Sequence, residues 1–250
     1  MPLYIQTNII AQRAISGLKQ TTDNLKSSFQ RLSSGLRINS ASDDAAGLAV
    51  AENLSTKKQS LRQARKNTND GISIVQTAEG ATSEVANILK RMRELATQSS
   101  TETLNNNERS YIQSEFQELS DEIDRISETT EFNGISLTEG NPTTGADTAL
   151  DVQVGIDNSA GDRIAINLGN LHASKLGVAH SGSTGKISMS TAAGAQDALT
   201  KVTKALKTVN VYRSRYGAVQ NRLESALNQI ESSQETTETA ESRIRDLDFA

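Results

Sequence analysis

The chain has 250 residues, a formal net charge of −4 from 26 basic and 30 acidic side chains, and no cysteine. The interspersed charges and the lack of a basic stripe argue against nucleic acid as a partner, and the absence of cysteine excludes disulfides, thiolate metal sites and cysteine nucleophiles. Aromatic residues make up 3% and the only prolines are Pro2 and Pro142, so the composition favours long helices with narrow seams over a deep globular core.

The first ten residues contain neither a basic region nor a continuous apolar run, so we expect no cleavable secretory signal, and no apolar run is long enough to cross a bilayer. Apolar side chains then recur on one side of a predicted helix from about residue 3 to residue 36. Because the segment lacks an evident partner, we expect it to be ordered only where another helix covers this stripe. The stripe comprises Ile5, Ile9, Leu18, Leu25, Phe29, Leu32 and Leu36.

Residues 33–42 are predicted to form a hinge, in which Gly35 and Asn39 can take conformations that end a helix. Ser42 is a candidate N-cap for the next helix, with acidic residues directly after it. Apolar residues at steps of three and four predict one long helix from there to about residue 99. Gly71 and Gly80 mark expected places for a bend or for close approach of a neighbouring backbone.

A third helix is predicted over residues 106–129, antiparallel to the second because the connection is short. Residues 132–134, Phe-Asn-Gly, form a turn signal. The next segment is rich in glycine, serine, threonine and aspartate, and it contains two alternating runs at 150–156 and 163–168. These runs, separated by turn chemistry at 157–162, predict a β-hairpin. Helical periodicity returns from about residue 195 to residue 230, with a possible continuation beyond.

The predicted fold is therefore mainly α, an elongated coiled-coil-like helical bundle with a small β-hairpin insertion. The sequence offers few side chains that could come together in a catalytic site. His172 and His180 are interpreted as surface loop histidines, because no carboxylate lies at metal-ligand spacing from them. Residues 157–162 lack the acid spacing of a calcium loop, and no phosphate loop, zinc-protease or nucleophile-elbow motif occurs. We expect no enzyme, no cofactor and no metal site. The acidic run Glu118, Asp121, Glu122 and Asp124 reads as a solvated face paired with Arg125 and other basic residues.

One segment of the long helix invites two interpretations. Residues 90–98 place Arg91, Leu95 and Gln98 on one face, with a leucine that looks exposed. Such a face is either half core seam and half solvent, or a contact surface for another protein, since arginine and leucine side by side suit subunit packing.

Residues 30–49, Gln-Arg-Leu-Ser-Ser-Gly-Leu-Arg-Ile-Asn-Ser-Ala-Ser-Asp-Asp-Ala-Ala-Gly-Leu-Ala, resemble the N-terminal signature of bacterial flagellin. Further matches lie at 65–80, 93–98, 132–134 and 240–246. Together they cover both helical ends of the chain in the order of that family, with a variable segment between them.

This resemblance implies three parts. Residues 1–42 would form the inner-tube helix and hinge, residues 43–134 and 194–250 a helical rod, and residues 135–193 the hairpin insertion. It also implies a structural role: export without a cleavable signal through the flagellar type III apparatus, contact with the filament cap, and polymerisation into an extracellular propeller for motility. The stripe from Ile5 to Leu32 would pack in the inner tube.

The resemblance also suggests a contact surface. Arg91, Leu95 and Glu115 match positions where flagellins contact neighbouring protofilaments and where the flagellin-sensing Toll-like receptor of vertebrates binds, and Gln98 lies on the same helix face. We expect Arg91, Leu95 and Glu115 to form one exposed cluster in the monomer.

Flagellins continue past the Arg-Ile-Arg-Asp segment with another apolar helix, whereas this sequence stops at Ala250. We expect the N-terminal stripe to lack its intramolecular cover, this form not to build a normal filament by itself, and binding of the export chaperone to be in doubt. The alternative function is a hook-filament junction protein of the same superfamily. An enzyme embedded in the short middle segment is not favoured.

Overall fold

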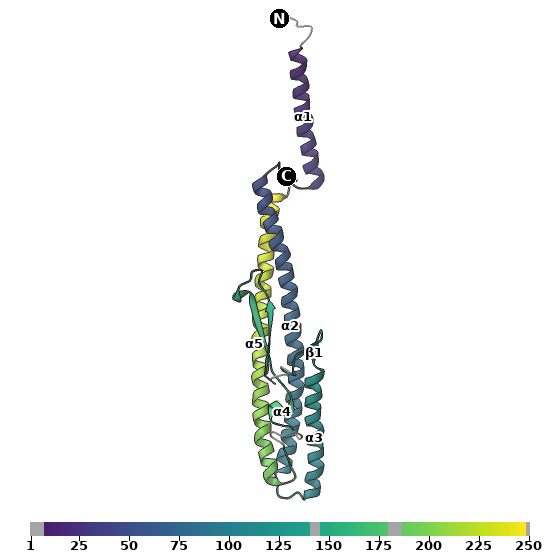
Figure 1. Cartoon of the computed structure of the whole chain (residues 1–250), viewed down its shortest axis with the longest axis vertical. Coiled ribbons are helices and arrows are strands. Elements are labelled where there is room, and N and C mark those ends of the chain that lie inside the picture. Colours follow the sequence, from purple (N-terminus) through teal and green to yellow (C-terminus); the bar gives the residue numbers. More distant parts are fainter. Residues whose placement is uncertain (1–7, 141–145, 180–186, 249–250) are drawn as a thin grey trace. The chain divides into compact units, whose positions relative to one another are not determined.

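The computed structural model describes residues 8–140, 146–179 and 187–248, and Figure 1 shows their arrangement. The described helices are α1 (Ile9–Ser34), α2 (Ala45–Ser99), α3 (Asn106–Thr129), α4 (Ala173–Leu176) and α5 (Ala192–Arg245), with a 3-10 turn η1 (Ala160–Asp162). The strands are β1 (Glu131–Phe132), β2 (Ile135–Ser136), β3 (Thr148–Gln153) and β4 (Arg163–Leu168). The predicted mainly α bundle with a small β-hairpin insertion is confirmed.

The chain forms two compact units. One comprises Met1–Arg62 with Glu231–Ala250, and the other comprises Gln63–Ile230. Both long helices, α2 and α5, contribute residues to each unit. The larger unit also contains α3 and the whole hairpin insertion, whereas the smaller unit contains α1 and the hinge that follows it.

The core of the larger unit is a narrow seam between α2, α3 and α5, which run side by side (Figure 1). Val85 and Leu89 of α2, Phe116 of α3 and Leu223 of α5 have no exposed surface and belong to one cluster. Each comes from a predicted apolar series at three- and four-residue steps, so the seam that the periodicity predicts is confirmed. Thr68 and Thr82, which stand in place of apolar residues in the α2 stripe, are also fully buried.

Those threonines fit an apolar seam because their hydroxyls are satisfied within the helix. Thr68 donates to the carbonyl of Ala64 at 2.8 Å, and Thr82 donates to that of Ala78 at 2.6 Å. A threonine bonded in this way presents its methyl group to the neighbouring helix and leaves no buried donor without a partner.

The hairpin of β3 and β4 is antiparallel, with Thr148 opposite Leu168 and Gln153 opposite Arg163. Along β4 the exposed and buried residues alternate, and the buried side chains are Ile164, Ile166 and Leu168. One face of the hairpin therefore packs against the helices and belongs to the same buried cluster. Gly71 of α2 is a point of close approach, because a Cβ there would lie 3.1 Å from a methyl of Val152. Gly80, by contrast, faces open space.

Two tyrosines of α5 hold the end of β4. The hydroxyl of Tyr216 accepts a hydrogen bond from the amide of Gly169 at 3.0 Å, and the hydroxyl of Tyr212 donates to Asp147 at 3.0 Å. Burial and the Asp147 carboxylate raise the pKa of Tyr212 to about 12, so this phenol is a donor at any physiological pH. The ring of Tyr212 lies directly against Gly169, where a Cβ would be only 2.6 Å from it.

The turn between α2 and α3 is built around a buried arginine. Arg109 donates to the carbonyls of Ser99 at 3.1 Å and Leu104 at 2.7 Å, and also to that of Thr101. Asn105 and Glu108 form a reciprocal capping box at the start of α3. These bonds satisfy the exposed backbone groups of both helix ends, so the short connection reverses the chain and α3 returns alongside α2 as predicted.

Helix α5 runs to Arg245, so the continuation beyond Ile230 that the sequence left open is present, and buried Thr237, whose hydroxyl donates to the carbonyl of Ser233, continues the stripe there. Two local predictions need correction. Helix α2 is capped by Asp44, which accepts from the amide of Gly47 at 2.8 Å, and not by Ser42. The hydroxyl of Ser42 lies instead 2.7 Å from that of Ser40.

The second correction concerns His172, which is not a free loop residue. Its Nδ1 lies 3.0 Å from a carboxylate oxygen of Asp124, and the same oxygen accepts from the amide of Ala173 at 2.8 Å. Asp124 therefore fastens α4 to α3 instead of facing solvent. The predicted pair of Glu122 and Arg125 does form, at 2.6 Å. His180 lies outside the described residues.

Replacing Gly169 with alanine tests the packing of β4 on α5. We expect Gly169→Ala to lower the free energy of unfolding by about 1–3 kcal/mol, because the new Cβ overlaps the ring of Tyr212. Gly217 is the matched control: it lies within α5, and a Cβ there would meet nothing within 4 Å. Gly217→Ala should raise stability by about 0.5–1 kcal/mol. Urea unfolding of both variants measures the difference, and equal stabilities would contradict the packing described.

Candidate assembly surfaces

Helix α1 carries an apolar stripe that the described chain leaves uncovered. No residue of this helix is buried. The exposed fractions at the predicted positions are Ile9 56%, Leu18 71%, Leu25 56%, Phe29 62% and Leu32 57%. Ile5 lies outside the described residues. A continuous row of exposed large apolar side chains is unusual on a soluble surface, and such rows mark contacts with other proteins or membranes.

The ends of α1 are nevertheless well defined by local bonds. The side chain of Asn8 accepts from the amide of Ala11 at 3.0 Å and so caps the first turn. At the other end Gly35 has φ 71°, the left-handed conformation that glycine adopts most easily, and its amide donates to the carbonyl of Arg31. The predicted helix stop at Gly35 is confirmed.

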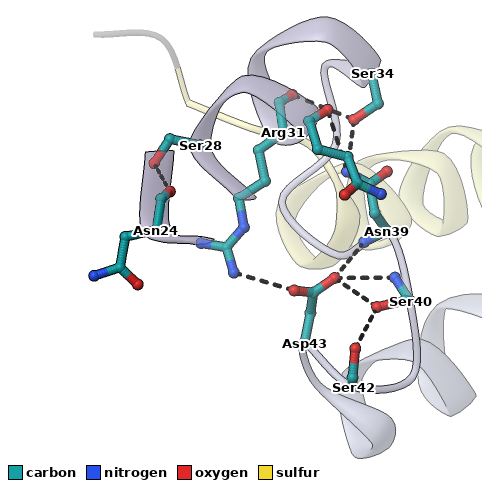
Figure 2. A network of polar contacts seen from close by, with 9 residues as sticks. Asn24, Ser28, Arg31, Ser34, Asn39, Ser40, Ser42 and Asp43 are labelled. Atoms are coloured by element: carbon teal, nitrogen blue, oxygen red, sulfur yellow. Dashed lines mark hydrogen bonds and ion pairs between the residues drawn. The ribbon is translucent and has the colours of Figure 1, made fainter. Parts of the chain in front are cut away.

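The hinge after α1 is organised around one carboxylate, as Figure 2 shows. Asp43 accepts from the amide of Asn39 at 3.2 Å, from the amide and hydroxyl of Ser40 at 3.0 Å each, and from Arg31 at 3.4 Å. These bonds, that of the Ser40 hydroxyl foremost, hold the pKa of Asp43 below its ordinary value. The side-chain amide of Asn39 donates in turn to the hydroxyl of Ser34 at 2.8 Å.

The hinge is also fastened to the C-terminal end of α5. Arg37 donates two bonds to the carbonyl of Ile244, at 3.2 and 2.7 Å, and its amide donates to the carbonyl of Arg245 at 2.7 Å. The amide of Leu247 donates to the carbonyl of Gly35 at 2.9 Å. Arg37 thereby supplies a cation and donors to carbonyls that a helix end leaves without partners.

A second candidate surface lies on α2 and α3 in the larger unit. Arg91 donates to Glu115 through Nε at 2.9 Å and through Nη2 at 2.7 Å, and to Glu94 at 3.1 Å. Glu115 is the main cause of the raised pKa of Arg91. Both side chains are about half exposed, and Gln98 is also exposed. Three of the four predicted contact residues are therefore available on the surface of the described chain.

The expectation that Leu95 is exposed is wrong, since only 1% of it is accessible. Leu95 continues the seam of Val85, Leu89 and Met92, all of which are buried in the same cluster. Of the two interpretations of residues 90–98, the core seam holds for Leu95, and surface exposure holds for Arg91 and Gln98.

Several structural residues could not be identified from local patterns. The capping box of Asn105 and Glu108 was not predicted, although its two members lie three residues apart and so carry a local sequence signal. Arg109 carried no such signal, because its acceptors are carbonyls of an irregular turn. Arg37 bonds to a carbonyl 207 residues away, which no local pattern reveals.

Neither a metal centre nor a membrane span is found in the part of the chain that the structure describes. Among residues 8–140, 146–179 and 187–248, no three or more histidine, aspartate or glutamate side chains are grouped to hold a metal. None of the helices described in these ranges combines the length and apolar character that a bilayer crossing needs.

Two family models match this chain: the bacterial flagellin N-terminal helical region over residues 5–143 and the C-terminal helical region over residues 199–250. The sequence is 39% identical to a flagellin of Halalkalibacterium halodurans, covering 99% of this chain and 87% of that protein. It is also 39% identical to the flagellar filament core protein flaB2 of Brachyspira hyodysenteriae and to a flagellin of Bacillus subtilis. Each of these matches covers 99% of this chain and 88% of the relative.

Solved structures give similar matches. The crystal structure of Bacillus cereus flagellin superposes with a TM-score of 0.54 at 30% identity, covering 66% of this chain and 88% of that one. A putative flagellar hook-associated protein from Vibrio parahaemolyticus superposes with a TM-score of 0.65, covering 82% of this chain and all of that one. Its identity is 17%, so this likeness concerns the fold alone.

The Asp43 network predicts a pH-dependent hinge. A carboxyl whose pKa is lowered by folding stabilises the folded form above its ordinary pKa of 3.8, and this contribution disappears as the pH falls through the lowered value. We expect the amide resonances of Asn39 and Ser40 to titrate below pH 3.8, and to lose this titration in Asp43→Asn. NMR titration against a peptide of residues 39–44 measures the midpoints. A midpoint equal to or above that of the peptide would contradict the network.

Proposed function

Because the chain belongs to the bacterial flagellin family, we propose that it is a structural subunit of the extracellular flagellar filament, built by helix packing between copies and used for motility. The observation that carries this proposal is the bare stripe of α1. Five described apolar side chains along it are more than half exposed, although burial of a leucine or phenylalanine contributes about 1.5–3 kcal/mol. A neighbouring subunit can supply the missing cover.

The relatives support the filament over the hook-filament junction. One relative with 39% identity is named a flagellar filament core protein, and two others are named flagellins. The hook-associated structure shares only 17% identity, and a bundle with terminal helices is common to both kinds of protein. The three-part division into residues 1–42, residues 43–134 with 194–250, and residues 135–193 belongs to this proposal.

The proposal includes how the subunit reaches the filament. As a flagellin it would leave the cell through the flagellar type III export apparatus and be placed beneath the filament cap. Family membership supports these two partners. A helix with no buried residue also suits passage through a narrow export channel, because α1 has little tertiary packing to unfold.

A third partner in this proposal is the flagellin-sensing Toll-like receptor of vertebrate hosts. We assign Arg91, Gln98 and Glu115 to a contact surface for neighbouring protofilaments or for this receptor. The exposed pair of Arg91 with Glu115, in which two guanidinium donors share one carboxylate oxygen, supports the assignment, because arginine in a fixed geometry on a helix surface is a frequent anchor of protein interfaces. Leu95 contributes from within by holding the helix in place.

Substitutions on α1 test the filament role. We expect Leu18→Ser combined with Leu25→Ser to reduce filament mass per cell at least tenfold, because both side chains need cover from another subunit. Lys19→Ser combined with Lys26→Ser is the matched control on the same helix and should leave filaments normal. Both pairs are introduced into the gene in the bacterium that carries it, and electron microscopy with soft-agar swimming measures the result.

The thermal unfolding of the purified chain should be equal in both α1 variants, since these side chains are exposed. Normal filaments in the leucine variant would exclude the stripe as an assembly surface.

Substitutions in the α2 segment test the receptor assignment. We expect Arg91→Ala to lower receptor signalling in a cell reporter assay about tenfold without changing the fold, because Arg91 is exposed. Leu95→Ala should cost about 2–5 kcal/mol of stability, since it leaves a cavity in the seam. Leu95→Met keeps the volume and should retain most signalling. Unchanged signalling by Arg91→Ala would reject the assignment.

A further inference from the structure

Tyr111 on α3 is an exposed aromatic residue in a chain that has few of them. Its exposed fraction of 76% is the highest of any large hydrophobic side chain in the described residues. The tyrosines of α5, Tyr212 and Tyr216, are buried and hydrogen-bonded. Tyr111 belongs to no part of the seam, so the fold of the single chain does not explain it. Tyrosine at such a position is typical of interface anchors, because it offers a large contact area with few rotatable bonds.

Tyr111 lies in an acidic stripe. Glu108 precedes it by three residues, Glu115 and Glu118 follow it by four and seven, and all three are exposed. Glu115 is paired with Arg91, and Glu108 takes part in the capping box. Glu118 has no ion-pair partner among the described residues. The surface around the ring is therefore apolar at its centre and acidic around it.

A groove of about 780 Å³ lies between α2 and α5 in the same unit. Leu206 of α5 lies in it, and Lys90, Arg93 and Thr97 of α2 line its side. Its one acidic residue, Glu94, is paired with Arg91. Lys90 and Arg93 are exposed, and neither makes an ion pair with the residues that the structure describes. The lining of the groove thus combines the apolar side chain of Leu206 with the basic side chains of Lys90 and Arg93.

The geometry points to a contact between two copies of this chain, in which Tyr111 of one copy inserts into the Leu206 groove of the next. The aromatic ring meets Leu206, and the glutamates around Tyr111 meet Lys90 and Arg93. The two surfaces differ, so the contact is heterologous. Each pair of copies therefore still has one free Tyr111 surface and one free Leu206 groove. Contacts of this kind do not close on themselves unless the rotation forms a ring, and they add copies in a row.

This inference rests on the proposed function and specifies which residues of two neighbouring copies would meet. A second copy is favoured as the occupant because both complementary surfaces are present on the same chain, with opposite charge. Binding of an acidic segment from another protein is the competing occupant, which the following experiment separates.

Disulfide trapping tests the contact, and the natural chain has no cysteine to give a background signal. Ser114→Cys lies one helical turn from Tyr111 and keeps the aromatic ring, and Thr97→Cys lies in the groove. After mild oxidation of the two full-length variants, one of them tagged, we expect their mixed dimer to form at least tenfold faster than that of Ser114→Cys with Gln76→Cys. Gln76 is an exposed α2 residue outside the groove.

Adding Tyr111→Ser to the Ser114→Cys partner should lower the trapping rate to that of the control pair, whereas adding Tyr111→Phe should preserve it. Circular dichroism establishes that each variant folds. Equal trapping rates for the groove and control pairs, while sedimentation shows associated copies, would overturn this contact and leave the filament role intact. Equal rates with a chain that stays monomeric at every concentration would also overturn this contact, and the filament role is tested separately by the α1 variants in the cell.

Discussion

The structure depends on one constraint: the apolar stripe of a helix has to be covered by another helix along its length. In the larger unit this is achieved by α2, α3 and α5, whose stripes meet in a seam of mostly aliphatic side chains. A seam needs no large aromatic filling, which explains how a chain with 3% aromatic residues keeps Val85, Leu89 and Leu223 fully buried. Buried threonines and Arg109 fit because each threonine hydroxyl and each of the three guanidinium nitrogens donates to a carbonyl.

The same constraint is unmet in α1, and the proposed role follows from that. Its sequence secures the two ends of the helix through Asn8 and Gly35, and the hinge bonds of Asp43 and Arg37 fix the chain that follows it. Yet none of its apolar side chains is buried within the described chain. Local bonds thus prepare a surface that only another molecule can bury, which is how a helical subunit differs from a self-sufficient domain.

Sequence periodicity predicted most of the fold, because the spacing of apolar residues directly records which helix face is buried. It placed α3 and β4 at their observed bounds, whereas it placed β3 two to three residues too late in the chain. It left the last turns of α5 open, because there the stripe is carried by Thr237. For Leu95 the periodicity was right and the expectation of exposure was wrong. Pairs such as Asp124 with His172, or Arg37 with Ile244, join residues far apart in sequence, and no local pattern encodes them.

Hydrogen exchange measured by mass spectrometry is the most direct test of this account, because amide protection reports which helices are covered. In the free monomer, amides of residues 74–96 in α2 should exchange at least a hundredfold more slowly than those of residues 9–34 in α1. On assembly, α1 should become as protected as α2. If α1 in the free monomer were already as protected as α2, its stripe would be covered within the chain and the account would be wrong.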